Sequence, residues 1–480
     1  MKTSIRSKKK KGGAQKNINI TGLPGIYRFL KKTRANVKNR DVFNFINRYN
    51  LSTPMVLKNT QKQRILNNYK NSYNNNRNNN GNVPEGYDLC RIIESIGNQY
   101  RIIKYLGKGQ YGLVYLAEPL SEEAIGRCGG KIGIALKEIN APSTQDIKKI
   151  LIETIALYRC KNPFITNILD FMVNSSNRHY IAMDLAPGGD MYENIRLFRD
   201  KGLSINFKFN LVQTITKQLL IALYTLHQKD IIHSDLKPEN IVLMNNGDDF
   251  YEIPYVKLAD FGLAYIYPHR AYQGSPLYMA PEVANNSLNR PSFEDIPINQ
   301  QLEILKKTDV WSLACIILEL LTGFHIFEKG NYGVRTIEEL QEIHGIFIYD
   351  FSKNLHKMEI SIAENYIINY IKDSFNSFNS EHDKQLLNIV NFFKKCFTKN
   401  NDRALIIELI QYLNDNPWGD VVESKVPELD KLWSELVGSG KENYKPEQFL
   451  GNSNKKNTNT LLVDVLRKNS VNINEIIDKL

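Results

Sequence analysis

A chain of 480 residues is longer than one hydrophobic core usually organises, so the length predicts more than one globular part. Hydrophobic residues make up 42% and charged residues 24%, the ordinary range of soluble proteins, and the most apolar stretch, residues 310–324, is too short and too polar to span a bilayer. The net charge of +11 is concentrated near the N-terminus, because residues 1–80 hold 19 Lys and Arg and a single acidic residue, Asp41.

The first 95 residues are predicted to form a basic, asparagine-rich extension that is partly disordered. Two low-complexity stretches, MKTSIRSKKKKGG and NNYKNSYNNNRNNNGN, bracket a region with enough apolar residues for a few short helices. Four consecutive lysines, Lys8–Lys11, suit contact with nucleic acid or an anionic lipid surface, or nuclear import. An ordinary solvated tail is an equally good interpretation.

The targeting signals of secreted or anchored proteins are not seen. There is no apolar signal segment, Lys2 stands where myristoylation needs glycine, and the five cysteines form no CxxC pair. These features predict an intracellular protein, cytoplasmic or nuclear, without a transmembrane segment and with reduced thiols.

Short β-like runs follow from residue 100, at 100–106, 113–118, 132–139, 168–173 and 180–184. A helical pattern that opens with the capping sequence Ser143-Thr144-Gln145-Asp146 lies between the third and fourth runs. Beyond Gly189 the chain is mainly helical, and one buried helix face is predicted from Val212, Ile215, Leu219, Ala222 and Leu226.

This order predicts an α+β fold with two lobes. A small β-rich lobe with one main helix, residues 98–184, precedes a larger, mainly helical lobe, residues 190–420. Residues 421–480 are predicted to be a C-terminal helical extension.

A glycine-rich stretch joins the first two β-like runs. Its residues are Gly107, Lys108, Gly109, Gln110, Tyr111, Gly112, Leu113 and Val114. Glycines let a backbone approach phosphate closely, but this pattern alone is weak evidence. A dinucleotide-binding turn needs a helix to begin at the last glycine, whereas the residues that follow are strand-like. The stretch therefore favours a glycine-rich hairpin over a nucleotide.

Strand alternation places Ala135 and Lys137 on the same face of the third run. A lysine that faces inward needs a partner, because an unpaired buried ammonium is costly. Glu153, on the predicted helix, is the best candidate, and two ordinary surface charges are the alternative.

The stretch IIHSDLKPENIVL, residues 231–243, places three polar residues between apolar anchors. Phosphoryl transfer needs a carboxylate to deprotonate a hydroxyl, a cation to hold phosphate and oxygen ligands for magnesium. Asp235, Lys237 and Asn240 can supply this set, and Asp260, after another β-like run, offers a second oxygen ligand.

In this order, and together with YIAMDLAPGGD, GSPLYMAPEV and TDVWSLACIILELLTG, these motifs resemble a eukaryotic-type protein kinase domain over residues 98–420. The DLKPEN sequence is similar to the serine/threonine branch, which implies a bilobal kinase that transfers phosphate from ATP, with Mg²⁺, to Ser/Thr hydroxyls of protein substrates.

The resemblance also assigns roles. Asp235 would be the catalytic base, Lys237 the γ-phosphate contact, Lys137 the α/β-phosphate contact paired with Glu153, and Asn240 and Asp260 the metal ligands. Contacts to ATP would come from Gly107, Lys108, Gly109, Gln110, Tyr111, Gly112, Val114, Ala135, Lys137, Met183 as gatekeeper, Asp184 and Ala186 in the hinge, Asp190 near the ribose, and Val242. Two further roles would be structural: Glu282 would pair with Arg403, and Asp309 would anchor the catalytic segment.

Three departures from the family pattern stand out. The loop of residues 118–131 is long, and residues 283–307 look like an insertion beside the substrate groove, for which we hypothesise a docking role. Ser234 stands where most active relatives have an arginine that pairs with a phosphorylated activation segment, so the chain resembles the variant without this arginine. We therefore expect activity that does not depend on phosphorylation of that segment. The alternative is a pseudokinase that serves as a scaffold for partners.

Overall fold

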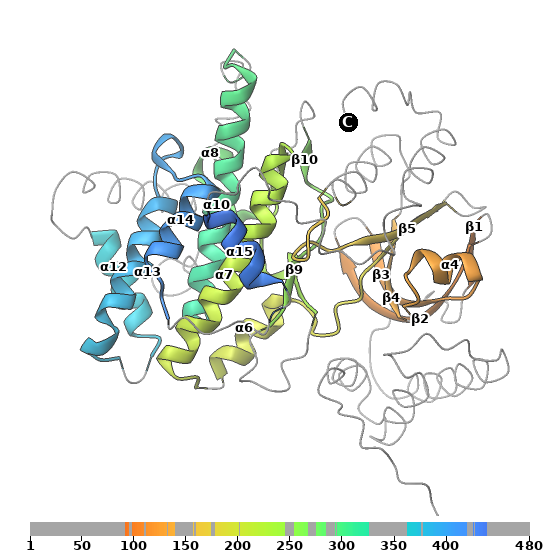
Figure 1. Ribbon diagram of the computed structural model, residues 1–480, viewed down its shortest axis with the longest axis horizontal. Helices are drawn as coiled ribbons and strands as arrows, with labels where there is room; N and C mark the ends of the chain where they lie inside the picture. The colour runs from red at the N-terminus through yellow and green to blue at the C-terminus, as the bar shows by residue number, and fades with distance from the viewer. Residues whose placement is uncertain are drawn as a thin grey trace, which may run out of the picture.

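The computed structural model describes residues 92–95, 98–109, 112–131, 133–139, 157, 160–173, 178–200, 202–244, 254–266, 275–284, 293, 295–325, 362–375, 378–419, 426 and 428–438. They form two parts, a curved β-sheet with one short helix packed on it and a larger bundle of helices (Figure 1). The predicted bilobal α+β fold is confirmed.

The sheet of the small lobe has six antiparallel strands in the order β1-β2-β3-β4-β6-β5. The strands are β1 (Ile92–Ser95), β2 (Asn98–Gly109), β3 (Gly112–Pro119), β4 (Ile134–Ile139), β5 (Ile168–Val173) and β6 (His179–Met183). Each of the five predicted β-like runs corresponds to one of β2 to β6. The runs are short and rich in branched and aromatic residues, which suits a pleated surface that is buried on at least one face.

The long loop between β3 and β4 contains a helix that the sequence did not predict, α4 (Glu122–Arg127). Ser121 caps it by accepting a hydrogen bond from the backbone N–H of Ala124 at 3.2 Å. Ala124 and Cys128 are fully buried with Tyr100 and other side chains of the sheet, so α4 covers one face of it. The predicted main helix of this lobe lies outside the described residues except for Leu157, which is helical and buried.

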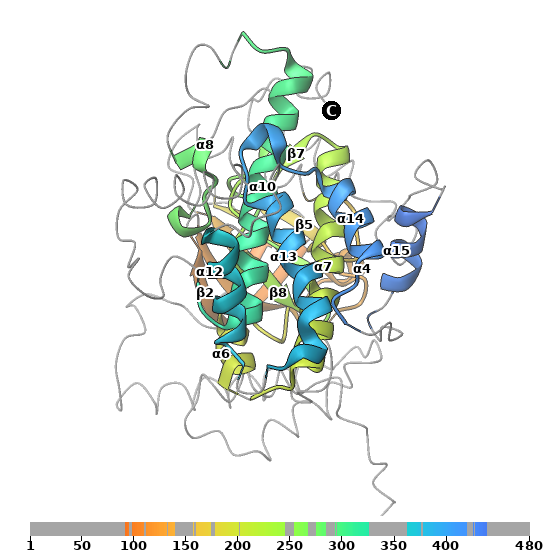
Figure 2. The same ribbon diagram turned by 90° about the vertical axis from the view of Figure 1, so that its left-hand side faces the viewer.

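The large lobe is built around two long helices, α7 (Ile205–Gln228) and α10 (Ile298–Thr322). The predicted buried face of α7 is confirmed, since all five of its predicted residues are at most 1% exposed. The other helices are α6 (Met191–Asp200), α8 (Pro281–Ala284), α12 (Ile362–Lys372), α13 (Asp383–Cys396), α14 (Ile406–Asp415) and α15 (Leu429–Val437). Figure 2 shows α12, α13 and α14 gathered around α7 and α10.

Two small two-stranded sheets of the large lobe frame the catalytic stretch. Strand β8 (Ile241–Leu243) pairs with β9 (Val256–Leu258), and β10 (Tyr265–Ile266) pairs with β7 (Ile231–Ile232). The apolar residues at both ends of the stretch, among them Ile231 and Leu243, are buried. The polar residues between β7 and β8 are thus held at a fixed position by burial on either side.

The predicted insertion of residues 283–307 is only partly a loop. Its last ten residues are the first turns of α10, which project beyond the neighbouring helices (Figures 1 and 2). Phe293 is buried with Ile232 and Leu305 in a small apolar cluster beside the catalytic stretch. The start of α10 packs Leu302, Ile304 and Leu305 into this cluster and leaves Asn299, Gln300 and Glu303 exposed, so it has an apolar and a polar side.

Of the stretch 421–480, the structure describes residue 426 and residues 428–438. Helix α15 packs against α7 and α14, where Trp433 donates a hydrogen bond to Asn414 at 3.4 Å and carries the ammonium of Lys217 over its ring at 5.0 Å. Within the described part of the chain, no helix is both long and apolar enough to cross a membrane.

Candidate active site

Polar side chains of the catalytic stretch form one closed network with Ser275. Asp235 accepts hydrogen bonds at Oδ1 from the backbone N–H and the hydroxyl of Ser275, at 2.9 and 3.0 Å. Its Oδ2 lies 2.9 Å from the ammonium of Lys237 and 3.2 Å from Nδ2 of Asn240. Lys237 also donates to the Ser275 hydroxyl at 3.0 Å. The structure thus brings together the three residues of this stretch that the sequence grouped.

A single 3₁₀ turn, Pro238–Asn240, folds the stretch so that these side chains converge. The backbone N–H of Asn240 donates to the carbonyl of Lys237 at 3.0 Å, and its side-chain amide donates to the carbonyl of Asp235 at 2.7 Å. Proline at the first position suits the turn, because its missing N–H has no partner there in any case. The spacing of two and three residues therefore places the three side chains around one point.

Asp309 holds the backbone that precedes Asp235. Its buried carboxylate accepts hydrogen bonds from the backbone N–H of His233 at 2.9 Å, from that of Ser234 at 3.0 Å and from Nε2 of His227 at 2.9 Å. Ser234 has φ of 66°, a left-handed conformation that costs free energy in a residue with a side chain. The bonds to Asp309 hold Ser234 in this conformation, and the predicted anchoring contact is confirmed.

Asp260 faces the small lobe because its neighbour is buried. The Phe261 side chain is fully buried and lies with its ring 5.0 Å from that of His233. The Asp260 carboxylate is 28% exposed and accepts a hydrogen bond at 2.9 Å from Lys137 of β4. Burial by itself would raise the pKa of Asp260, but the Lys137 ammonium, helped by His233 and a backbone N–H, brings this pKa below its usual value. Asp260 is thus held as a carboxylate.

The central strand β4 presents the lysine predicted to contact phosphate. Ala135 and Lys137 are both buried, and Lys137 is opposite Val114 of β3 and Ile181 of β6. Glu153, its predicted partner, lies outside the described residues. Lys137 and Asp260 join the two lobes directly, although they are 123 residues apart in the sequence.

The glycine-rich stretch is a hairpin, as the sequence favoured. Gly107 is opposite Val114 and Gly109 is opposite Gly112 in the β2–β3 ladder. Gly112 is required by packing, because a Cβ there would lie 2.0 Å from the backbone oxygen of Glu138. Gln110, Tyr111 and the side chain of Lys108 lie outside the described part of the hairpin.

The predicted hinge begins where β6 ends at Met183. The next residue, Asp184, has a buried carboxylate that accepts hydrogen bonds from Lys257 Nζ at 2.7 Å, Asn167 Nδ2 at 2.9 Å and Lys131 Nζ. Burial alone would raise the pKa of Asp184, but the two ammonium groups lower it to about 2. Asp184 is therefore ionised at any pH at which the protein would work.

The end of the hinge is tied to the large lobe. The carbonyl of Ala186 accepts a hydrogen bond from Gly189 N–H at 3.3 Å, and Asp190 forms an antiparallel bridge with Val242 of β8. The Asp190 carboxylate accepts a hydrogen bond from the N–H of Glu193 at 3.0 Å, so it caps α6. Capping fixes the position of Asp190 at the mouth of the predicted nucleotide site.

The oxygens that the sequence proposed for Mg²⁺ suit a hard cation. Because Asn240 uses its Nδ2 to hold Asp235, its Oδ1 is left for a metal ion, and Asp260 supplies an ionised carboxylate. Two protein oxygens are too few for a closed cage, and Mg²⁺ generally binds through one or two such ligands plus phosphates and water. The donor set therefore fits a metal that arrives with a nucleotide.

Comparison with known proteins agrees with this geometry. The family model described as "Protein kinase domain" matches residues 100–413. The chain belongs to the protein kinase family. It is 30% identical over 270 residues to the human serine/threonine-protein kinase Nek5. This matched region covers 54% of this chain and 33% of Nek5. It is 31% identical over 259 residues to the probable serine/threonine-protein kinase fhkD of Dictyostelium discoideum. That match covers 51% of this chain and 32% of fhkD. The chain thus spans about a third of the length of these curated relatives.

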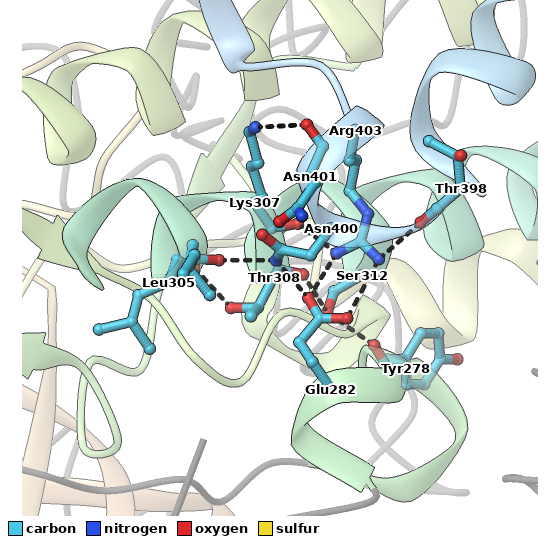
Figure 3. Close-up of polar contacts among 11 residues, drawn as sticks. Tyr278, Glu282, Leu305, Lys307, Thr308, Ser312, Thr398, Asn400, Asn401 and Arg403 are labelled. Atoms are coloured by element: carbon cyan, nitrogen blue, oxygen red, sulfur yellow. Dashed lines mark hydrogen bonds and ion pairs between the residues drawn. The ribbon is translucent and has the colours of Figure 1, made fainter. Parts of the chain in front are cut away.

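Within this kinase domain, a further ion pair fixes the segment that follows Ser275. Glu282 accepts hydrogen bonds from Arg403 at 2.6 and 3.2 Å and from Asn400 at 2.7 Å (Figure 3). The buried Arg403 also donates to two backbone carbonyls and stacks over the ring of Trp311, with 5.1 Å between its Cζ atom and the ring centroid. The predicted pairing of Glu282 with Arg403 is confirmed, and it ties α8 to the helical core.

Sequence reasoning missed two residues of the kinase site, Lys131 and Lys257, which bind the Asp184 carboxylate. For Lys257 the local signal pointed the other way, since strand alternation in YVKLAD places it on the face opposite Val256 and Leu258. Lys131 had no signal, because it lies 53 residues from Asp184 in a loop of no recognisable pattern.

Proposed function

We propose that this chain is a protein serine/threonine kinase that transfers the γ-phosphate of ATP to Ser or Thr hydroxyls of protein substrates, with Mg²⁺ as cofactor. The observation that carries the proposal is the closed network of Asp235, Lys237, Asn240 and Ser275 opposite the Lys137–Asp260 pair. A carboxylate, a nearby ammonium and two metal-type oxygens around one point are the set that phosphoryl transfer requires.

The proposed reaction gives each side chain a step. Asp235 accepts the proton of the substrate hydroxyl as the hydroxyl oxygen forms its bond to the γ-phosphorus, and the bond from that phosphorus to the β–γ bridging oxygen breaks to release ADP. Lys237, whose ammonium lies 2.9 Å from the Asp235 carboxylate, would balance the charge on the transferred group. Lys137 would hold the α- and β-phosphates, and the hairpin at Gly107–Val114 would cover them.

Asn240 and Asp260 would hold Mg²⁺, which neutralises charge on the phosphates when it is bound. The lowered pKa of Asp260 supports this role, because a metal ligand has to be deprotonated. Met183, Asp184 and Ala186 would line the adenine site, with Asp190 near the ribose, and Ala135 and Val242 would contact the nucleotide from the two lobes.

The finer part of the proposal is that activity does not depend on phosphorylation of the activation segment. Ser234 offers no cation to a phosphate, and its backbone is already held by Asp309. The hydroxyl of Ser275 bonds directly to Asp235 and Lys237. Treatment with a phosphatase should therefore leave the rate of transfer unchanged, and loss of activity after that treatment would contradict the proposal.

A phosphate-transfer assay on a degenerate peptide array tests the function itself. Wild-type protein should label Ser and Thr peptides, and Asp235→Asn should label none, because the base is gone while the shape of the site is kept. No transfer by either protein would favour the alternative, a pseudokinase scaffold. Labelling by both proteins at equal rates would show that Asp235 is not the base.

Two proposals concern partners. Residues 283–307 would dock protein substrates, since Phe293 packs beside the catalytic stretch and the start of α10 projects from the lobe. Equal rates on every substrate after deletion of residues 287–299 would refute this docking role.

The basic residues 1–95 would contact nucleic acid or an anionic surface. Such binding should weaken as the salt concentration rises, and binding by this segment that does not weaken with salt would refute the contact.

A further inference from the structure

The loop that carries α4 is fixed to the small lobe at two points. The hydroxyl of Ser121 accepts hydrogen bonds from the backbone N–H groups of Ala124 and Gln99, both at 3.2 Å. At the other end of α4, Arg127 donates at 3.2 Å to the buried carboxylate of Asp170 on β5. Figure 1 shows α4 lying against the sheet of the small lobe. The helix is therefore a rigid part of the lobe.

Beyond α4 the same loop reaches the hinge. Lys131 donates to Asp184, and the backbone of Gly133 runs beside Leu185, because a Cβ on Gly133 would lie 3.5 Å from the Leu185 Cδ2 atom. A short segment of the loop thus contacts two successive hinge residues, one through a charge and one through an apolar side chain.

The Asp184 carboxylate is the point where three parts of the chain meet. Lys131 comes from the α4 loop, Asn167 directly precedes β5, and Lys257 lies in β9, three residues before Asp260. The backbone N–H of Asp184 donates to the carbonyl of Asn167 at 3.2 Å, so this side of the peptide is held as well. The side chain and the N–H together hold the Cα of Asp184 in place, which limits the positions open to the hinge peptide that follows it.

Resting on the proposed function, we infer that Lys131 is a positioning residue for the adenine of ATP. By holding the Asp184 carboxylate from the side of the α4 loop, Lys131 orients the hinge peptides that face the adenine ring. Loss of Lys131 leaves the carboxylate bound to Lys257 and Asn167 alone and lets the hinge peptides rotate. The phosphate contacts, which lie on other elements, are not affected.

Direct binding measurements by calorimetry separate these effects. Adenosine reports the contacts to adenine and ribose without those to phosphate, and inorganic triphosphate with Mg²⁺ reports only the phosphate contacts. Lys131→Met should weaken adenosine and ATP by the same factor, on the order of 3-fold to 10-fold, and leave triphosphate binding unchanged. In steady-state assays it should raise KM for ATP with kcat unchanged. Lys131→Arg, which keeps the charge, should restore most of the adenosine affinity.

Lys306→Met is the matched control, because Lys306 is also paired with a carboxylate, that of Asp230 at 2.7 Å, but lies in the large lobe. The Lys131 side chain is 46% exposed, so its replacement should not prevent folding. Adenosine affinity equal to wild type in Lys131→Met, with or without a lower melting temperature, would overturn the inference, as would an equal loss in Lys306→Met.

The two proposals fail separately. If wild-type protein binds adenosine but transfers no phosphate, and Lys131→Met weakens adenosine binding, the proposed kinase activity is wrong and the role of Lys131 stands. If wild-type protein transfers phosphate but Lys131→Met binds adenosine as tightly as wild type does, the role of Lys131 is wrong and the kinase activity stands.

Discussion

Replacement of Asp309 by asparagine tests whether catalysis depends on the backbone that this residue anchors. The substitution keeps the shape of the side chain but converts one acceptor oxygen into an NH₂ donor and removes the charge. Oriented with its oxygen toward His233 and His227, the asparagine would place NH₂ against the N–H of Ser234. The N–H of Ser234 would then lose its acceptor, and the hydrogen bond that holds Ser234 in its left-handed conformation would be gone.

The loss can be estimated from the three contacts. The hydrogen bond to Ser234 is lost, which costs about 1.5 to 3 kcal/mol because its acceptor is charged. The other two become bonds to a neutral acceptor, and this weakening costs about 1 kcal/mol each. We expect Asp309→Asn to lower the free energy of unfolding by about 3 to 5 kcal/mol in urea titrations. Because Asp235 follows Ser234 directly, a shift of about 1 Å in this segment should lower kcat by roughly 10-fold to 100-fold.

A matched control separates catalysis from stability. Asp170→Asn also alters a fully buried carboxylate with three donors, which are Tyr100 Oη at 2.7 Å, Arg127 at 3.2 Å and the N–H of Phe171 at 2.9 Å. It should cost similar stability but leave kcat within about 2-fold, since Asp170 lies in the small lobe away from the catalytic stretch. A kcat for Asp309→Asn that equals wild type, or that falls no further than that of Asp170→Asn, would refute the reasoning.

Three further predictions follow from single contacts. Ser275→Ala removes a hydroxyl bonded to Asp235 and should lower kcat by about 10-fold, even in protein treated with phosphatase; an unchanged kcat would show that the hydroxyl has no part in catalysis. Arg403→Met leaves Glu282 without its buried partner and should cost about 3 to 5 kcal/mol in urea titrations, whereas a loss under about 1 kcal/mol would contradict the predicted anchoring. Burial lowers the pKa of His325 from 6.5 to about 3, against a smaller opposing effect of a backbone hydrogen bond, so below pH 6.5 the unfolded chain takes up a proton that the folded one does not. Stability should fall by about 2 kcal/mol between pH 7 and pH 5, and His325→Phe should lose that part of the fall; equal falls in both proteins would exclude His325 as its source.

Local patterns in the sequence were sufficient for the strands and the central helix. The runs that became β2 to β6 and the buried face of α7 follow from periods of two and of 3.6 residues, which depend on neighbours along the chain. Short or polar elements did not show this signal. Helix α4 has six residues with one buried side chain, Ala124, so it has no apolar stripe that a pattern could show.

In the candidate site as well, features that depend on neighbours along the chain could be predicted, and features that depend on distant residues could not. The sequence by itself determined which residues could carry phosphoryl transfer, because Asp235, Lys237 and Asn240 lie within six residues and one turn brings them together. Only the tertiary structure decided what holds those groups in place. Asp309 beneath Ser234 and Lys131 beside Asp184 act across 75 and 53 residues, and the strength of such contacts comes from the burial of the carboxylate, which no local pattern records.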